Sequence, residues 1–150
     1  MGPERVFWAP KRDLAGHLAR LRAADLFLDT WPCNAHTTAS EALWAGVPVL
    51  TVPGRTFASR VAASLVSACG LAELACTDAE HYVAFAAALA NDPVALAGLK
   101  AHLETSRPRL PLFDAEGLAR DLDALLIRMH ERHLAGLPPD HLPAAARGSH

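Results

Sequence analysis

Residues 26–52 read LFLDTWPCNAHTTASEALWAGVPVLTV, and this stretch decides the fold. A short apolar run at its start predicts a strand, which is followed by the polar loop Thr30 to His36. A helix is predicted from about Thr38 to Ala45, and Gly46 stands where a left-handed residue closes a helix. Val47 to Val52 is a β-branched run with almost no polar side chain, typical of a strand buried on both faces. The order strand, helix, strand predicts a right-handed βαβ unit with parallel strands.

The segments on either side continue this alternation. Upstream, Arg5 to Trp8 is strand-like, and Lys11 to Ala24 carries leucines at helical spacing. Downstream, a helix is predicted from Phe57 to about Cys69, and Leu71 to Ala75 predicts one more short strand. We therefore expect an α/β fold of the Rossmann-like type, in which ligands bind beyond the carboxyl ends of parallel strands.

From Asp78 onward the pattern is purely helical. Residues 78–90 and 93–105 predict two helices, and Asp114 starts a longer one with an apolar stripe on one side. The stripe consists of Leu118, Leu122, Leu125, Leu126 and Met129. The expected parts are a partial Rossmann-like lobe at 1–106, a linker and long helix packing on the lobes at 107–142, and a tail with a tag remnant at 143–150.

Bulk properties exclude several classes of protein. The hydrophobic fraction of 51% predicts a packed core, and the net charge of −2 gives no general electrostatic reason to bind nucleic acid or an anionic membrane. No apolar run is long enough to span a bilayer, and Met1 is followed by Gly-Pro-Glu rather than by a signal peptide. Three irregularly spaced cysteines favour reduced thiols. These features predict a cytoplasmic protein.

The segment Thr30 to Glu41, TWPCNAHTTASE, carries the chemistry. It lies between a strand end and a helix start, where backbone amides without partners and the helix dipole favour an anion. His36, Thr37 and Thr38 add side-chain donors at that point, which suits a diphosphate. An ordinary capping box, in which Thr38 and Glu41 bond to each other's backbone amides, explains the same residues without a ligand.

The residues that follow carry a resemblance. Residues 41–49, EALWAGVPV, resemble the E-A-x-x-x-G-x-P-V signature of the nucleotide-binding lobe of GT-B glycosyltransferases. A longer set of segments is similar to the catalytic domain of the O-GlcNAc transferases, over roughly residues 5–142. These segments are Ala9 to Lys11, Asn34 to Thr38, Leu43 to Gly46, Val52 to Gly54, Ala58 to Ser64 and Pro139 to His141.

The resemblance implies the C-terminal, UDP-binding lobe of a GT-B fold, incomplete at its N-terminus and with extra C-terminal helices. It implies inverting transfer of GlcNAc from UDP-GlcNAc to Ser or Thr hydroxyls of proteins, without a metal or other cofactor. The N-terminal catalytic lobe and the tetratricopeptide-repeat region would then be further partners, in the same or another chain. We expect this chain alone to be inactive, with the catalytic base elsewhere.

By the same resemblance, His36, Thr37 and Thr38 hold the diphosphate. Lys11 contacts the ribose and adds positive charge near the nucleotide, so these four residues stabilise the leaving group. Glu41 stands where the family usually has Asp and takes the ribose hydroxyls. For Lys11, the alternative is a solvated surface charge.

The resemblance assigns uracil binding to Ala9, His17 and Arg20. The backbone of Ala9 reads the uracil edge, and His17 and Arg20, three residues apart on one helical face, flank the base. The alternative for this pair is two exposed helix residues. Asn34 shapes the loop as readily as it contacts ligand, and Arg60 is expected to make structural hydrogen bonds.

Other candidate sites have weaker support in the sequence. Asp121 and Asp123 match the D-x-D pattern of metal-dependent glycosyltransferases, but they are read as a solvated helix face. His130 and His133 lack a third metal ligand, and Cys33 lacks an activating neighbour in sequence. The functional alternatives are a GT-B enzyme that uses another UDP-sugar, a non-catalytic UDP-binding module, and a structural piece that docks on a partner.

Overall fold

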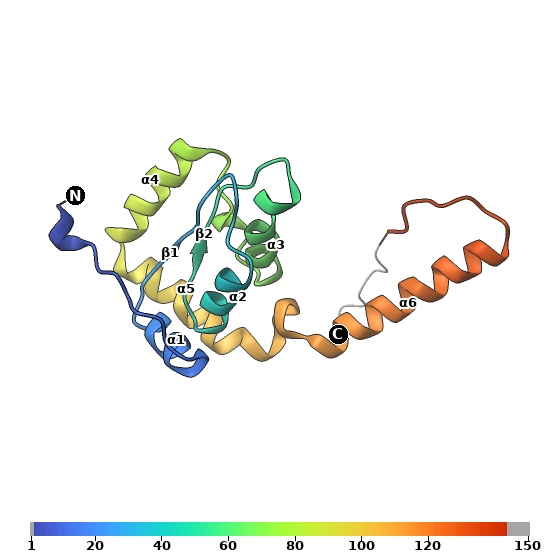
Figure 1. The fold of residues 1–150 in the computed structure, drawn as a ribbon, viewed down its shortest axis with the longest axis horizontal. Helices are drawn as coiled ribbons and strands as arrows, with labels where there is room; N and C mark the ends of the chain where they lie inside the picture. The colour runs from blue at the N-terminus through green and yellow to red at the C-terminus, as the bar shows by residue number, and fades with distance from the viewer. Residues whose placement is uncertain (1, 144–150) are drawn as a thin grey trace. The chain divides into compact units, whose positions relative to one another are not determined.

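The computed structural model describes residues 2–143. The chain forms two compact units, which divide between Arg107 and Pro108 (Figure 1). In the first unit the helices and strands are α1 (Leu14–Leu21), β1 (Phe27–Leu28), α2 (Thr37–Trp44), β2 (Val49–Leu50), α3 (Val61–Ala68), α4 (Ala79–Ala90) and α5 (Pro93–Ser106). Short 3-10 turns are η1 (Pro3–Arg5), η2 (Phe57–Ser59), η3 (Ala72–Leu74) and η4 (Arg107–Arg109), and the second unit holds η5 (Pro111–Phe113) and α6 (Ala115–Leu134).

Two parallel strands form the centre of the first unit. Phe27 pairs with Val49 and Leu28 with Leu50. A parallel bridge from Thr51 to Ala75 extends the pairing on the far side of β2. In Figure 1 the strands lie between α4 on the left and α3 on the right. The parallel strand–helix–strand order predicted from residues 26–52 is therefore confirmed, with a second strand shorter than the predicted Val47 to Val52.

The core is built around β2 and the helix that precedes it. Leu43, Val47, Val49, Leu50 and Val66 are all 0% exposed. Gly46, directly after the C-cap of α2, adopts a φ of +86°, as its position predicted. A Cβ atom at this residue would lie 3.3 Å from Cγ of Glu104, so both the backbone and the neighbour favour glycine.

Two strand predictions were wrong. Arg5 to Trp8 forms no strand in the described structure, where η1 ends at Arg5 and Phe7 and Trp8 are 86% and 94% exposed. A strand requires hydrogen-bonding partners on a neighbouring strand, and the described residues supply none for this segment. Within the strand predicted at 71–75, residues 72–74 form η3 instead, and only Ala75 pairs, in a single bridge to Thr51. The helix predicted for 57–69 is divided at Arg60 into η2 and α3.

Aspartates begin most of the helices. Asp13, Asp78, Asp92 and Asp114 each accept a hydrogen bond from a backbone amide three residues on, at the starts of α1, α4, α5 and α6. At Asp78 the bond from the His81 amide is the main cause of a lowered carboxyl pKa. These side chains satisfy donors that the helices themselves leave free.

In the second unit, α6 is the dominant element. Its side chains Leu118, Leu122 and Met129 are 65%, 52% and 51% exposed, so the predicted apolar stripe lies open in this unit. The segment after α6 folds back on the helix, because Arg132 Nε donates to Pro138 O at 2.6 Å and Arg128 Nη1 to Pro143 O at 2.7 Å. Packing of α6 on the lobes stays a prediction. The tail with a tag remnant predicted at 143–150 lies outside the described residues, except for Pro143.

Among the described residues no single helix has both the length and the apolar character to cross a bilayer, and α4 with α5 reaches them only jointly, across a 97° bend.

The three cysteines differ in accessibility, which gives a testable expectation. Cys33 is exposed, whereas Cys69 and Cys76 are buried, and burial raises the pKa of the Cys69 thiol to about 11. Since the thiolate is the reactive form, iodoacetamide at pH 8 should modify Cys33 and spare the other two in the folded chain. Peptide mass spectrometry checks this, with a sample in denaturant as the control in which all three react. Equal labelling of the three in the folded chain would contradict the described packing.

Candidate functional site

The start of α2 differs from the aspartate-capped starts. His36 is the N-cap residue, and no side chain bonds to the first turn. Within the part of the chain that the structure describes, the amides of Thr37, Thr38 and Ala39 meet no acceptor. His36, Thr37 and Thr38 are all exposed. The helix therefore presents free backbone donors and two hydroxyl groups to solvent at its positive end.

The capping-box alternative is wrong. The box requires Thr38 to be the N-cap, but the N-cap is His36, two residues earlier, so Thr38 lies inside the first turn. Glu41 does not reach back to this turn, because its Oε2 lies 3.3 Å from Nε2 of His17 in α1. The donors at the helix start are left for another partner.

A turn from elsewhere in the chain braces His36. Its Nε2 lies 3.5 Å from the carbonyl oxygen of Ala58 in η2, and its ring meets the ring of Phe57 edge-on at 5.9 Å between centroids. A capping box between Thr56 and Ser59 holds η2 itself. This contact fixes where the imidazole stands beside the helix start.

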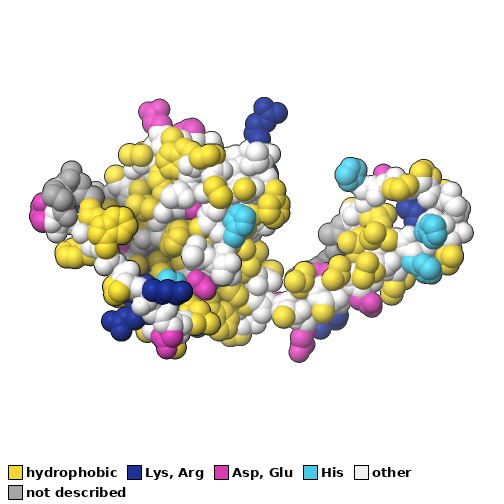
Figure 2. All heavy atoms as spheres, in the orientation of Figure 1, with side chains coloured by type: hydrophobic (Ala, Val, Ile, Leu, Met, Phe, Trp, Pro, Cys, Tyr) yellow, Lys and Arg dark blue, Asp and Glu magenta, His cyan; other side chains and the backbone are white. Residues whose placement is uncertain are grey.

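A second group of predicted residues is joined by a chain of polar contacts. Arg20 donates from Nη1 to Pro10 O at 2.7 Å and from Nη2 to Nδ1 of His17 at 3.2 Å. Because a guanidinium only donates, Nδ1 accepts and the proton of a neutral imidazole sits on Nε2, which faces Glu41. These contacts tie the residues around Ala9 and Lys11 to α2. Figure 2 shows basic, acidic and histidine side chains gathered beside α1.

The structure thus links His17, Arg20 and Glu41 through polar contacts and places the other predicted group, His36 to Thr38, at the start of α2. Thr37 and Glu41 are four residues apart on this helix, so they share a face. Lys11 is exposed and forms no ion pair with any residue in 2–143. Arg60 donates to Gly54 O at 3.1 Å, the structural role expected for it.

The loop before α2 contains a residue that sequence reasoning passed over. Asp29, only 3% exposed, accepts from the Ala35 amide at 2.7 Å and from Thr51 Oγ1 at 2.6 Å. Asn34 shapes the same loop by donating from Nδ2 to Thr30 O at 3.0 Å. An acidic residue directly after an apolar strand was the available signal for Asp29, since such a position is buried at the sheet's carboxyl edge.

Comparisons with known proteins show the family to which this chain belongs. The family model described as glycosyl transferase family 41 matches residues 1–122. The chain belongs to this family. The UDP-N-acetylglucosamine–peptide N-acetylglucosaminyltransferase of Caenorhabditis elegans is 36% identical over 142 residues, or 95% of this chain and 12% of that protein. The structure of an O-GlcNAc transferase mutant of Thermobaculum terrenum superposes with a TM-score of 0.72 at 35% identity, over 81% of this chain and 23% of that one.

Membership of family 41 and this superposition confirm the predicted fold class, an α/β lobe of the GT-B kind. The chain spans 12% of the nematode protein and 23% of the bacterial chain, so it corresponds to a small part of each. The roles assigned to individual site residues stay predictions.

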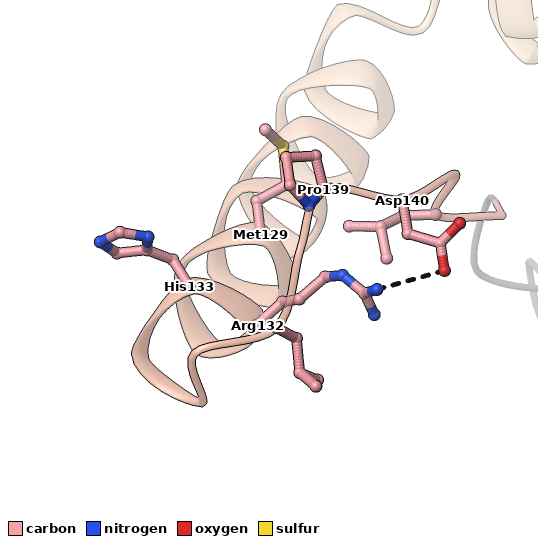
Figure 3. Close-up of a pocket in the computed structure, with 7 residues that line it drawn as sticks. Met129, Arg132, His133, Pro139 and Asp140 are labelled. Atoms are coloured by element: carbon pink, nitrogen blue, oxygen red, sulfur yellow. Dashed lines mark hydrogen bonds and ion pairs between the residues drawn. The ribbon is translucent and has the colours of Figure 1, made fainter.

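A cavity in the second unit of this family 41 chain offers no better site. It has a volume of about 200 Å³ and lies between the end of α6 and residues 137–142. Figure 3 shows the guanidinium of Arg132 directed at Asp140, while His133 points away from both. Arg132 is already engaged by Asp140 at 3.3 Å and by Pro138 O, so the charge that would attract a phosphate is neutralised. The cavity is also below the usual size of a ligand pocket, about 300–1,000 Å³.

Over residues 2–143, no three His, Cys, Asp or Glu side chains lie close enough together to hold an ion. Asp121 and Asp123 are both exposed on α6, as expected of a solvated face.

Proposed function

We propose that this chain is the nucleotide-sugar-binding part of an inverting glycosyltransferase that transfers GlcNAc from UDP-GlcNAc to Ser or Thr hydroxyls of proteins. The observation that carries the proposal is the uncapped, exposed start of α2, with Thr37 and Thr38 one turn before Glu41. The names of the nematode and bacterial relatives support the donor and the acceptor class.

The chemical task of this part is to stabilise the departing diphosphate. Negative charge grows on the leaving group as the bond to the anomeric carbon breaks, and preorganised donors lower the barrier by meeting that charge. The α2 amides, the hydroxyls of Thr37 and Thr38, His36 and Lys11 supply these donors without a metal ion. Helix N-termini are suited to this role because their amides already point at the anion.

The nucleoside lies along the Lys11, His17 and Glu41 side of the site. One carboxylate oxygen of Glu41 is engaged by His17, and the other accepts from the ribose. Lys11 contacts the same ribose, and the backbone of Ala9 reads the uracil edge. Arg20 and His17 flank the base, and their contacts with Pro10 and Glu41 orient both sides of this pocket.

The remaining parts of the enzyme supply what this chain does not. The acceptor-binding lobe, the catalytic base and the tetratricopeptide-repeat region that recruits proteins are assigned to residues outside this chain. The protein acts in the cytoplasm on acceptor proteins, with no role for nucleic acid or a membrane.

Binding of UDP tests the proposal directly. UDP at 100 times its Kd should stabilise the chain by about 2.7 kcal/mol against unfolding, measured by thermal or denaturant unfolding. GDP at the same concentration is the control for a general effect of anions. Failure of UDP to stabilise the folded chain would favour a purely structural role.

Turnover separates the catalytic proposal from its alternatives. With the complementary lobe supplied, UDP-GlcNAc should transfer sugar to a peptide hydroxyl, whereas binding without transfer would identify a non-catalytic UDP module. Glu41 is longer by one methylene than the aspartate of the family pattern, and for this reason use of a different UDP-sugar is the alternative to be tested. Faster transfer from UDP-glucose than from UDP-GlcNAc would establish that reading.

A further inference from the structure

The carboxylate of Asp29 lies beneath the loop that leads into α2. Asp29 follows β1 directly, and its amide donates to Leu50 O at 3.0 Å, which fixes its backbone to β2. Its carbonyl oxygen accepts from the Tyr82 hydroxyl of α4 at 2.9 Å. The residue is therefore held by the sheet on one side and by α4 on the other.

Both side-chain oxygens are in use. Oδ2 accepts from Oγ1 of Thr51 at 2.6 Å, and Oδ1 accepts from the amide of Ala35 at 2.7 Å. Ala35 immediately precedes His36, the N-cap of α2. One carboxylate thus connects the end of β2 to the residue before the helix whose first amides are free.

The loop between these points depends on few other contacts. Thr30 Oγ1 donates to Cys33 O at 2.9 Å, and Asn34 Nδ2 donates to Thr30 O at 3.0 Å, both within the loop. The Asn34 amide donates outward to Ala58 O at 2.8 Å. The bond from Ala35 to Asp29 is the contact that ties the loop end to the sheet.

We propose that Asp29 is a positioning residue for the diphosphate site, acting through its hydrogen bond to the Ala35 amide. This inference rests on the proposed function. By fixing the start of α2 against the sheet, Asp29 holds the free amides and the hydroxyls of Thr37 and Thr38 in one arrangement before ligand arrives. Preorganisation of this kind raises affinity because a larger fraction of the protein is competent to bind.

The contribution is geometric and not electrostatic. A carboxylate charge on the protein side of an anion site repels the anion, so charge alone would weaken binding. Asp29→Asn keeps an oxygen for the Ala35 amide, and its NH2 group can donate to Thr51 Oγ1, since a hydroxyl also accepts. Asp29→Ala removes both contacts. The pair of variants therefore separates the hydrogen bonds from the charge.

The experiment compares UDP with uridine on the 150-residue chain by equilibrium titration. Asp29→Ala should lower the affinity for UDP about tenfold. This is the factor expected when one hydrogen bond to a charged group no longer stabilises the binding-competent conformation. Uridine, which lacks the diphosphate, should bind with unchanged affinity. Asp29→Asn should keep UDP affinity within about threefold of the original chain. Val66→Ala, which opens the core away from this loop, is the control and should leave the UDP-to-uridine ratio unchanged.

Each other outcome overturns the proposal in a distinguishable way. If Asp29→Ala weakened the binding of UDP and of uridine equally, the role of Asp29 would be structural only. If Asp29→Asn and Asp29→Ala lost the same UDP affinity, the hydrogen bonds of Asp29 would not be the cause. If Asp29→Ala does not fold, Thr51→Val takes its place and should weaken UDP binding without weakening uridine binding. Thr51→Ser should then restore the affinity for UDP. Equal loss of UDP and uridine binding in Thr51→Val would count against the proposal. If the unaltered chain bound UDP no more tightly than uridine, the proposed function itself would fall.

Discussion

Replacing Lys11 and Thr38 together with alanine is expected to lower the rate of sugar transfer by about 10³- to 10⁴-fold, since one donor to a developing oxyanion is worth about 10²–10³-fold. We expect less than the product of the two single-variant rate effects, because neighbouring donors to one group are not independent. Both residues face the leaving group in the proposed site. The rate is measured with the acceptor-binding lobe supplied, and UDP affinity is measured on the chain alone.

The chain offers a matched control for this double variant. Lys100 and Thr105 lie on α5, where Lys100 Nζ donates to Ala24 O at 2.8 Å and Thr105 Oγ1 to Ala101 O at 2.8 Å. Alanine at both of these positions removes the same two residue types away from α2, so UDP affinity should not change. If UDP binding survived the loss of Lys11 and Thr38 as well, the assignment of the site would be wrong.

The second large effect concerns stability. Leu43→Ala is expected to lower the free energy of unfolding by about 2–5 kcal/mol, as for other large-to-small changes in protein cores. Leu43 is 0% exposed and lies on α2, the helix that carries both Thr38 and Glu41. The cost combines the lost transfer of the side chain out of water with the cavity that remains. Urea denaturation with an unchanged m-value measures it.

Val83→Ala is the control for this change. Val83 lies on α4 and is 63% exposed, so its truncation should alter stability by no more than about 0.5 kcal/mol. A similar loss in the two variants would mean that α2 is not packed as described.

The sequence alone predicted those parts of the fold that local patterns determine. Val47 to Thr51 is buried because nearly every side chain in it is apolar, and that pattern is visible in the sequence itself. Gly46 is predictable for a similar reason, since a left-handed residue at a helix end favours glycine whatever the rest of the chain does. The strand predicted at 5–8 failed because strand formation depends on a partner elsewhere, which no local pattern reports.

In the candidate site too, features set by local sequence were predictable and long-range contacts were not. The donors at His36, Thr37 and Thr38 follow from their place after a strand and before a helix. The engagement of Glu41 by His17 does not follow, because the two residues lie 24 positions apart and meet only when α1 packs beside α2. The hydrogen bonds of Asp29 do not follow either, although its position after a strand was a local signal, because its partner Thr51 is 22 residues away, directly after β2.

Helix α1 gives the site an energetic asymmetry. This helix lies wholly within the described residues and contains no buried side chain, whereas α2 contains three. Segments with few buried apolar contacts open locally at low free-energy cost, while the rest of the protein stays folded. The pair proposed to flank the uracil, His17 and Arg20, therefore lies on a locally weak element, and the proposed diphosphate donors lie on a stable one. In the proposed site, a nucleotide that engages both helices would restrict the local opening of α1, and the conformational entropy lost would offset part of its affinity. Changes far from the ligand that stabilise α1 would then tighten binding without adding a contact.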